Sequence, residues 1–183
     1  AHGLFVVADV ANLPFKANAF DGEVSLHTIH HLPLEDHLTA YKELFRVLIP
    51  GSSMVVVNGW KNPPVERWVK AFRRITGKIW QKKLDSSDNH PLNANQPPTD
   101  QSKGKTFVSK YDAVWFKEAV GKYLPYEIWV WRSVSVGIMR TYIHENRMGH
   151  WLLHIIFRLE ELFPHYLGEK GVYPLIVIRK ING

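Results

Sequence analysis

The 183-residue sequence contains no cysteine, which excludes a disulfide framework, a thiolate nucleophile and a zinc-thiolate site. It has no internal repeat, and no apolar run approaches the roughly 20 residues that a membrane-spanning helix requires. No basic leader precedes the apolar residues 3–8, so we interpret them as a buried strand and not as a signal peptide. These absences are typical of a soluble protein and favour a cytoplasmic one.

The composition is that of a globular protein, with 45% hydrophobic and 22% charged residues. The length fits a single domain, so we predict one domain over residues 1–183. The net charge is +6 and the isoelectric point is about 9.5. This excess of positive charge favours polyanions or anionic lipid surfaces as partners, provided that the charge gathers on one face.

Three short apolar runs, rich in valine, predict strands that are buried on both faces of a parallel sheet; they span residues 4–10, 23–29 and 53–58. Between the last two runs, apolar residues recur at helical spacing up to Pro50-Gly51. A strand, a helix and a strand within so short a stretch predict a βαβ unit. Such units build open parallel sheets, which bind ligands beyond the carboxyl ends of their strands.

The next predicted helix runs from Pro64 to Lys83 and places an apolar stripe opposite a strongly basic face. It is followed by a polar segment, about residues 85–106, whose composition predicts a mobile loop. A helix is expected to restart at Ser109, with Ser109 as its cap and Asp112 reaching back to it.

The carboxyl-terminal third predicts two strands with a helix between them. Residues 126–136 are β-rich, and residues 173–179 form the last strand. Residues 147–166 form a helix whose apolar face is wide enough to be mostly buried.

Three sequence blocks follow one another in a characteristic order: Ala8-Asp-Val-Ala-Asn-Leu-Pro-Phe15, then Phe20-Asp-Gly-Glu-Val-Ser-Leu-His-Thr-Ile-His-His-Leu32, then Glu43-Leu-Phe-Arg-Val-Leu-Ile-Pro-Gly51. Their order and spacing resemble the class I S-adenosylmethionine-dependent methyltransferases, specifically the type 11 group, which acts mostly on small molecules. The resemblance implies an α/β fold with a Rossmann-like, open, mostly parallel sheet and an antiparallel carboxyl-terminal strand.

One part of the family pattern is missing from this sequence. The family opens with a glycine-rich loop after its first strand and an acidic residue at the end of its second, and neither precedes the first block here. We therefore expect the chain to match the family from the third strand onward, as a domain truncated at its N-terminus. The resemblance then implies that these 183 residues alone bind S-adenosylmethionine weakly or not at all.

The resemblance also implies which residues hold the cofactor. Asp9 would accept a hydrogen bond from the exocyclic amine of adenine, the backbone of Val10 would meet the ring, and Leu13 would pack on its face. A carboxylate at a strand end distinguishes an amino purine from an oxo purine by the direction of the hydrogen bond. Leu26 and His27, at the end of the family's fourth strand, would lie beside the methionine half.

His30 and His31 match a histidine pair that in this family faces the methyl-acceptor pocket. An imidazole with a pKa near its usual value can act as a general base for an oxygen or nitrogen acceptor. The alternative is a structural histidine that hydrogen-bonds backbone in a loop. The spacing of the histidines permits a metal site, but no carboxylate or cysteine accompanies them, so no metal site is predicted.

The function predicted from the resemblance is methyl transfer from S-adenosylmethionine to a small acceptor. Seven tryptophans favour an acceptor that is apolar, aromatic or lipid-like. Its contacts are expected from the variable segments: residues 58–60, the polar loop and the stretch 129–142. The alternative is a non-catalytic module that binds an anionic membrane or nucleic acid through the cationic helix 64–83. Nucleic acid is the weaker of those two partners, because no base-reading motif accompanies the charge.

Overall fold

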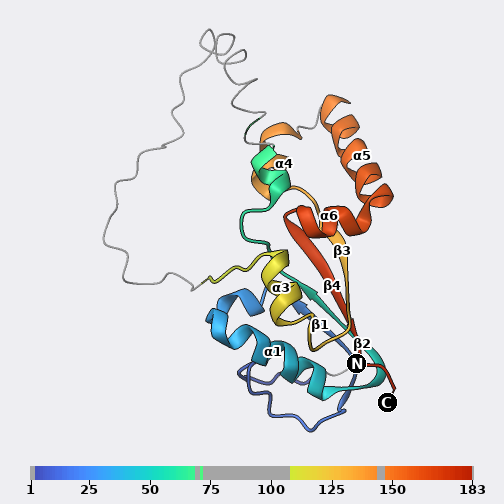
Figure 1. Cartoon of the computed structure of the whole chain (residues 1–183). Coiled ribbons are helices and arrows are strands. Elements are labelled where there is room, and N and C mark those ends of the chain that lie inside the picture. Colours follow the sequence, from blue (N-terminus) through green and yellow to red (C-terminus); the bar gives the residue numbers. More distant parts are fainter. Residues whose placement is uncertain (1–2, 69–70, 72–107, 144–146, 183) are drawn as a thin grey trace, which may run out of the picture.

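The computed structural model describes residues 3–68, 71, 108–143 and 147–182 of the chain (Figure 1). Its described part contains one four-stranded sheet in the order β1-β2-β4-β3. The strands are β1 (Phe20–Leu26), β2 (Leu48–Val57), β3 (Tyr126–Arg132) and β4 (Tyr173–Arg179). β1 is parallel to β2, whereas β4 is antiparallel to both β2 and β3. The predicted α/β class and the antiparallel carboxyl-terminal strand are confirmed.

The described helices connect and flank these strands. They are the 3-10 helix η1 (Ile29–His31), α1 (Leu34–Val47), α3 (Ala113–Ala119), α4 (Val136–Tyr142), α5 (Arg147–Leu162) and α6 (Pro164–Lys170). α1 joins β1 to β2 and completes the predicted βαβ unit. The acidic residues in its first turn and the basic Arg46 in its last turn both interact favourably with the helix dipole.

The hydrophobic core lies between the sheet and the helices α1 and α3, which Figure 1 shows on one side of it. Alternate residues of β2 and β4 point into this core, as the two-residue period of a strand requires. Its fully buried members include Tyr41, Leu48, Met54, Val56, Phe116, Val120, Ile176 and Ile178. The largest of these side chains come from the helices: Tyr41 of α1 packs on Phe116 of α3, and Phe116 packs on Tyr126 of β3.

The strand predicted at residues 4–10 is wrong for this structure. Residues 3–8 have no regular secondary structure, and Leu4, Phe5 and Val7 are 87%, 97% and 104% exposed. β1 is an edge strand of the sheet, and no described strand pairs with residues 3–8. An apolar run becomes a strand only where another strand satisfies its backbone groups, and here the described chain offers none.

Several predicted boundaries also shift. β1 ends at Leu26 and not at residue 29, because His27 has a φ of 54°, outside the extended region. The helix predicted from Ser109 begins at Ala113, where the Asp112 side chain caps it by accepting from the N–H of Trp115 at 2.9 Å. Asp112 is thus the cap itself, and not the residue that reaches back to Ser109.

The single helix predicted over residues 147–166 is two helices, α5 and α6. Pro164 is the first residue of α6, because its ring fixes φ and removes the N–H that a continuous helix would need. The expected burial of the α5 face is only partial, since Trp151 and Leu162 are 65% and 68% exposed. Figure 1 shows the reason: α5 extends away from the sheet, whereas α6 lies against β3 and β4.

The cationic helix is described only at its start. Residues 64–68 are helical, as predicted, and the side chain of Trp68 is exposed. Most of the range 64–83 and the predicted loop at about 85–106 lie outside the described residues. Within the described part of the chain, no helix has both the length and the apolar character needed to cross a membrane.

Candidate functional site

The carboxyl ends of β1 and β2 lie side by side, because Leu26 is paired with Val57 in the parallel register. The residues that follow the two strands, His27 and Asn58, are therefore neighbours at one edge of the sheet. His27 donates its backbone N–H to the carbonyl of Val57 at 2.8 Å. Its left-handed backbone conformation turns the chain sharply into η1.

The three predicted histidines lie together at this edge. The ring centroids of His27 and His30 are 5.6 Å apart, and those of His30 and His31 are 4.2 Å apart. The His27 ring also meets the ring of Tyr173, the first residue of β4, edge-on at 5.4 Å. The structure thus joins the predicted cofactor residue His27 to the predicted acceptor-side pair.

The side chain of His30 is hydrogen-bonded to a buried polar network. Nδ1 of His30 lies 3.4 Å from Oδ1 of Asn58, and Nδ2 of Asn58 donates to the hydroxyl of Tyr111 at 3.1 Å. The hydroxyls of Tyr111 and Tyr41 are 2.6 Å apart. If Nδ1 of His30 donates to the amide oxygen, Nε2 carries the lone pair and can accept a proton.

Burial shifts the pKa values of several groups in this network. Burial is the main reason why the pKa of His30 is below 6.5, although the hydrogen bond to Asn58 opposes that shift. Burial also lowers the pKa of His27, assisted by the positive charges of Arg132 and Lys110. The pKa of Tyr111 is raised to about 12, again by burial. Near pH 7 the rings of His27 and His30 are therefore neutral, and the phenol of Tyr111 is protonated.

The predicted adenine-binding residues lie on a different part of the chain. Asp9 is exposed and caps a short turn by accepting from the N–H of Ala11 at 2.9 Å. Val10 is half-buried. Leu13 donates its N–H to Oε2 of Glu43 at 3.0 Å, which ties this segment to α1.

Arg46 strengthens that tie. Its guanidinium donates to the carbonyls of Leu13 and Phe15 and pairs with Glu43 at 2.8 Å. Glu43 and Arg46 belong to the last turns of α1, near the amino end of the sheet, whereas His27 lies at the carboxyl end. Convergence of Asp9 with His27 on one cleft stays a prediction.

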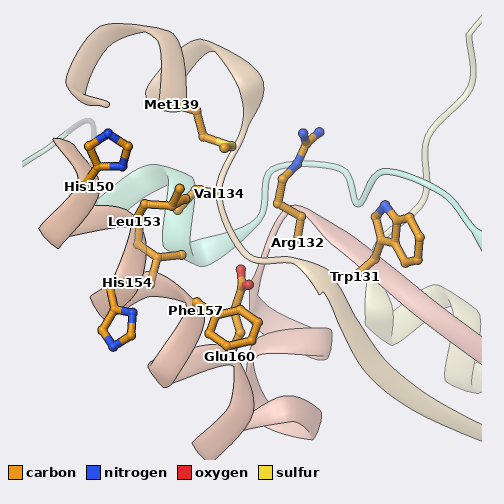
Figure 2. Close-up of a pocket in the computed structure, with 10 residues that line it drawn as sticks. Trp131, Arg132, Val134, Met139, His150, Leu153, His154, Phe157 and Glu160 are labelled. Carbon is orange, nitrogen blue, oxygen red and sulfur yellow. The ribbon is translucent and has the colours of Figure 1, made fainter. Parts of the chain in front are cut away.

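A cavity of about 660 Å³ opens at the carboxyl end of β3. β3 runs in the same direction as β1 and β2, so the cavity lies at the same edge of the sheet as the histidines. Figure 2 shows its walls: residues at the end of β3, one residue of α4 and several of α5. Arg132 lines the cavity, and its guanidinium carbon lies 4.5 Å from the centre of the Tyr173 ring.

Sequence reasoning missed Tyr111, Tyr173 and the α5 wall of the cavity. The stretch 129–142 was expected to bind substrate, and its residues 131, 132, 134 and 139 do line the cavity. Nothing in the local pattern of residues 147–166 distinguishes a helix that packs on a sheet from one that walls a cavity. Tyr111 precedes a helix by two residues, and only the tertiary fold brings it to Asn58.

The site offers a partial fit to S-adenosylmethionine. The backbone at Leu26 and His27 lies at the strand end that would border the methionine half, and Arg132 and Lys110 supply positive charge near it. One oxygen of Asp9 already accepts a hydrogen bond, and the other could accept one from an amine. The residues before Asp9 do not form the strand that would place it. Among the described residues no three histidine, aspartate or glutamate side chains gather to hold a metal ion.

Comparison with known proteins gives the family context. Residues 2–56 match the family model described as "Methyltransferase domain". The proteins named "Probable tRNA methyltransferase 9B" of Homo sapiens and of Bos taurus are each 38% identical over 52 residues, 28% of this chain. That region is 12% of the length of either relative, so the chain matches only a small part of each.

Solved structures extend the comparison to the rest of the chain. A SAM-dependent methyltransferase of Methanosarcina mazei aligns over 97% of this chain and 68% of its own, with 17% identity and a TM-score of 0.50. At this identity the likeness concerns the fold alone. The resemblance to class I S-adenosylmethionine-dependent methyltransferases is thereby confirmed, because residues 2–56 match the methyltransferase domain family and the described chain has the fold of such an enzyme.

Proposed function

We propose that this chain, folded as one partial domain over residues 1–183, serves in methyl transfer from S-adenosylmethionine to a small apolar or aromatic acceptor. The observation that carries the proposal is the cluster of His27 and His30 at the carboxyl edge of β1 and β2. This cluster lies within the residues that match the methyltransferase family. Through Tyr173, which contacts both His27 and Arg132, the cluster is connected to a cavity large enough for a small molecule.

The proposed roles follow from the family resemblance. Asp9, Val10 and Leu13 would contact adenine, and the backbone of Leu26 and His27 would border the methionine half. The cofactor supplies an electrophilic methyl group on a sulfonium, so the protein has to align the acceptor with that methyl and exclude water.

His30 is the proposed general base. The pKa of His30 is lowered, so the ring is neutral near pH 7, and Asn58 orients it with Nε2 as the proton acceptor. His31 lies against it and is the second candidate, since their ring centroids are only 4.2 Å apart. The alternative, a structural role for both rings, predicts no effect of either on methyl transfer beyond folding.

Nuclear magnetic resonance with millimolar ligand tests the cofactor site, because weak binding is expected. S-adenosylhomocysteine should shift the amide signals of Asp9, Val10 and His27 together. Adenosine alone should shift only the first two, and methionine alone should shift only His27. The signal of the Ala119 amide, in α3, serves as the internal control.

One outcome would count against the proposal, and a second would count against the expected weak affinity. If S-adenosylhomocysteine shifts none of these amides at millimolar concentration, the chain has no cofactor site. If it binds with micromolar affinity in a calorimetric titration, the expectation that these 183 residues bind weakly is wrong.

A second candidate acceptor is RNA. The matching relatives carry the name of a tRNA methyltransferase, and this chain has a net charge of +6. Arg67 and Trp68, at the start of the cationic helix, are exposed. Electrostatic binding to RNA would weaken steeply as salt concentration rises.

A gel-shift titration with unmodified tRNA at two salt concentrations separates the two acceptor classes. Salt-sensitive binding that is lost in Arg67→Gln, but kept in the control Arg179→Gln, supports RNA. Binding to anionic vesicles in place of tRNA supports the non-catalytic membrane module. Absence of both leaves the small acceptor as the proposal.

A further inference from the structure

The lining of the cavity at the end of β3 is mostly apolar, and its polar side chains are those of Arg132, His150, His154 and Glu160 (Figure 2). We propose that the cavity binds an apolar molecule bearing an anionic oxygen group, and that the guanidinium of Arg132 receives that group. This inference rests on the proposed function in one respect, namely that the bound molecule would be the methyl acceptor. Binding itself can be tested without methyl transfer.

The interior is suited to an apolar body. Most of its lining is aliphatic, aromatic or thioether carbon, contributed by Trp131, Val134, Met139, Leu153, Ile156 and Phe157. Its volume of about 660 Å³ falls within the range of pockets that bind small molecules. Phe157 is 54% exposed, so a large apolar surface here stays in contact with solvent unless a ligand covers it.

Arg132 supplies an unsatisfied positive charge. Its Nε–H is buried without a hydrogen-bond acceptor, and its contact with the ring of Tyr173 neutralises no charge. Within the described part of the chain, no carboxylate forms an ion pair with Arg132. A guanidinium in this state favours a planar or tetrahedral oxyanion, which it can bind through two N–H donors.

Glu160, the acidic residue of the lining, already has a structural task. One of its oxygens accepts from both the backbone N–H and the hydroxyl of Ser133, each at 2.7 Å. These two bonds join α5 to the residue that follows Arg132. Among the described residues no ion pair joins the Glu160 carboxylate to the Arg132 guanidinium, so Glu160 does not neutralise the charge offered to a ligand.

The position of Arg132 connects the cavity to the histidines. Tyr173 contacts the guanidinium of Arg132 and also the ring of His27. A ligand whose anionic group meets Arg132 would therefore have that end beside the proposed cofactor site. Its apolar body would extend away toward α5.

A matched pair of fluorescent probes tests the proposal on the full chain. 1-Anilinonaphthalene-8-sulfonate has an apolar body with an anionic group, and N-phenyl-1-naphthylamine has the same body without it. We expect the anionic probe to bind about tenfold more tightly, the worth of one charge-assisted hydrogen-bond pair. Arg132→Gln should abolish that preference and leave the affinity for the neutral probe unchanged.

Three more variants test whether the probes bind inside this cavity. Arg132→Lys should keep part of the preference for the anionic probe. Ile156→Trp, which fills the cavity, should weaken the binding of both probes. Arg158→Gln, an exposed change on the same helix outside the cavity, should alter neither. Unchanged binding of both probes in Ile156→Trp would place them on the outer face of α5 and overturn the proposal.

Displacement of the anionic probe identifies the anionic group. Decanoate and decyl phosphate present a carboxylate and a phosphate on the same chain, and decanol presents neither. Stronger displacement by either acid supports the proposal and names the group, whereas equal displacement by decanol contradicts it. If these assays fail, the proposed cofactor site is unaffected, because its titration does not involve the cavity. If the cofactor titration fails instead, the cavity can still bind a ligand, but that ligand would not be a methyl acceptor.

Discussion

Two valine-rich runs of this chain differ in structure: one forms a buried strand, and the other is exposed and forms no strand. Residues 53–57 of β2 are flanked by β1 and β4, and Met54, Val56 and Val57 are completely buried. Residues 4–7 have similar composition, yet they form no strand and are exposed. The difference is not in propensity but in neighbours, because a strand is stable only when both its backbone and its apolar face find partners.

The largest test of this contrast compares two phenylalanines. Phe116 is completely buried against Tyr41 and Tyr126, so Phe116→Ala should lower the free energy of unfolding by about 3–5 kcal/mol. Phe5 is 97% exposed, so Phe5→Ala should change it by less than about 0.5 kcal/mol. Urea unfolding followed by circular dichroism measures both. A loss of comparable size for Phe5→Ala would mean that residues 4–7 are packed.

The next test concerns the polar network beneath the site. Tyr111→Phe removes the hydroxyl that is bonded to the Tyr41 hydroxyl and to Nδ2 of Asn58, which should cost about 1–3 kcal/mol of stability. Tyr123→Phe is the control, because that side chain is exposed and keeps its ring contact with Lys42. Equal melting temperatures for the two variants would show that the hydroxyl network contributes nothing.

The open edge of the sheet provides a pH-dependent test. The two carboxylate oxygens of Glu23, in β1, are buried without hydrogen-bond partners, and burial raises the pKa of Glu23 to about 7. A folded-state pKa above the unfolded value of 4.5 means that stability is complete below pH 4.5 and is lost as pH rises through 7.

Glu23→Gln should therefore stabilise the protein at pH 8 by about 1 kcal/mol, a value discounted for partial exposure, and change little at pH 4. Thermal melts at the two pH values give the comparison. Glu161→Gln, at an exposed carboxylate on α5, is the control variant. Destabilisation by Glu23→Gln at pH 8 would mean that the charged carboxylate has a partner.

The smallest effect expected is on the titration of His30. Its folded-state pKa lies below 6.5, so its contribution to stability is present above pH 6.5 and is lost as pH falls toward the folded-state pKa. Because the hydrogen bond to Asn58 raises the pKa of His30, Asn58→Ala should lower it further. Imidazole proton resonances report the change, and Asn12→Ala, at an exposed and remote amide, should leave it unaltered. A rise in the His30 pKa in Asn58→Ala would refute the assigned hydrogen bond.

Local pattern predicted the elements of the fold well where neighbours in sequence become neighbours in space. The βαβ unit is such a case, since α1 and the pairing of β1 with β2 follow from periodicity and short connections. The predicted final strand likewise coincides with β4. The strand at residues 4–10 was wrong because its pairing depends on a strand that the described chain does not contain.

The candidate site likewise contains residues that the sequence predicted and residues that only the tertiary structure revealed. The family blocks drew attention to His27, His30 and His31, and the end of β1 and η1 bring them together. Tyr111, Arg132 and Tyr173 come from distant segments, and no spacing within the sequence relates them to the histidines.

By itself, the sequence determined the βαβ unit, the final strand and the family to which the first blocks correspond, because these depend on periodicity and on short ordered motifs. Only the tertiary structure decided which apolar runs are buried, and it alone placed Arg132 between the histidine cluster and a cavity walled by α5. The physical reason is that the burial of a side chain and the pairing of its charge depend on contacts between residues far apart in the chain. The local sequence does not specify those contacts.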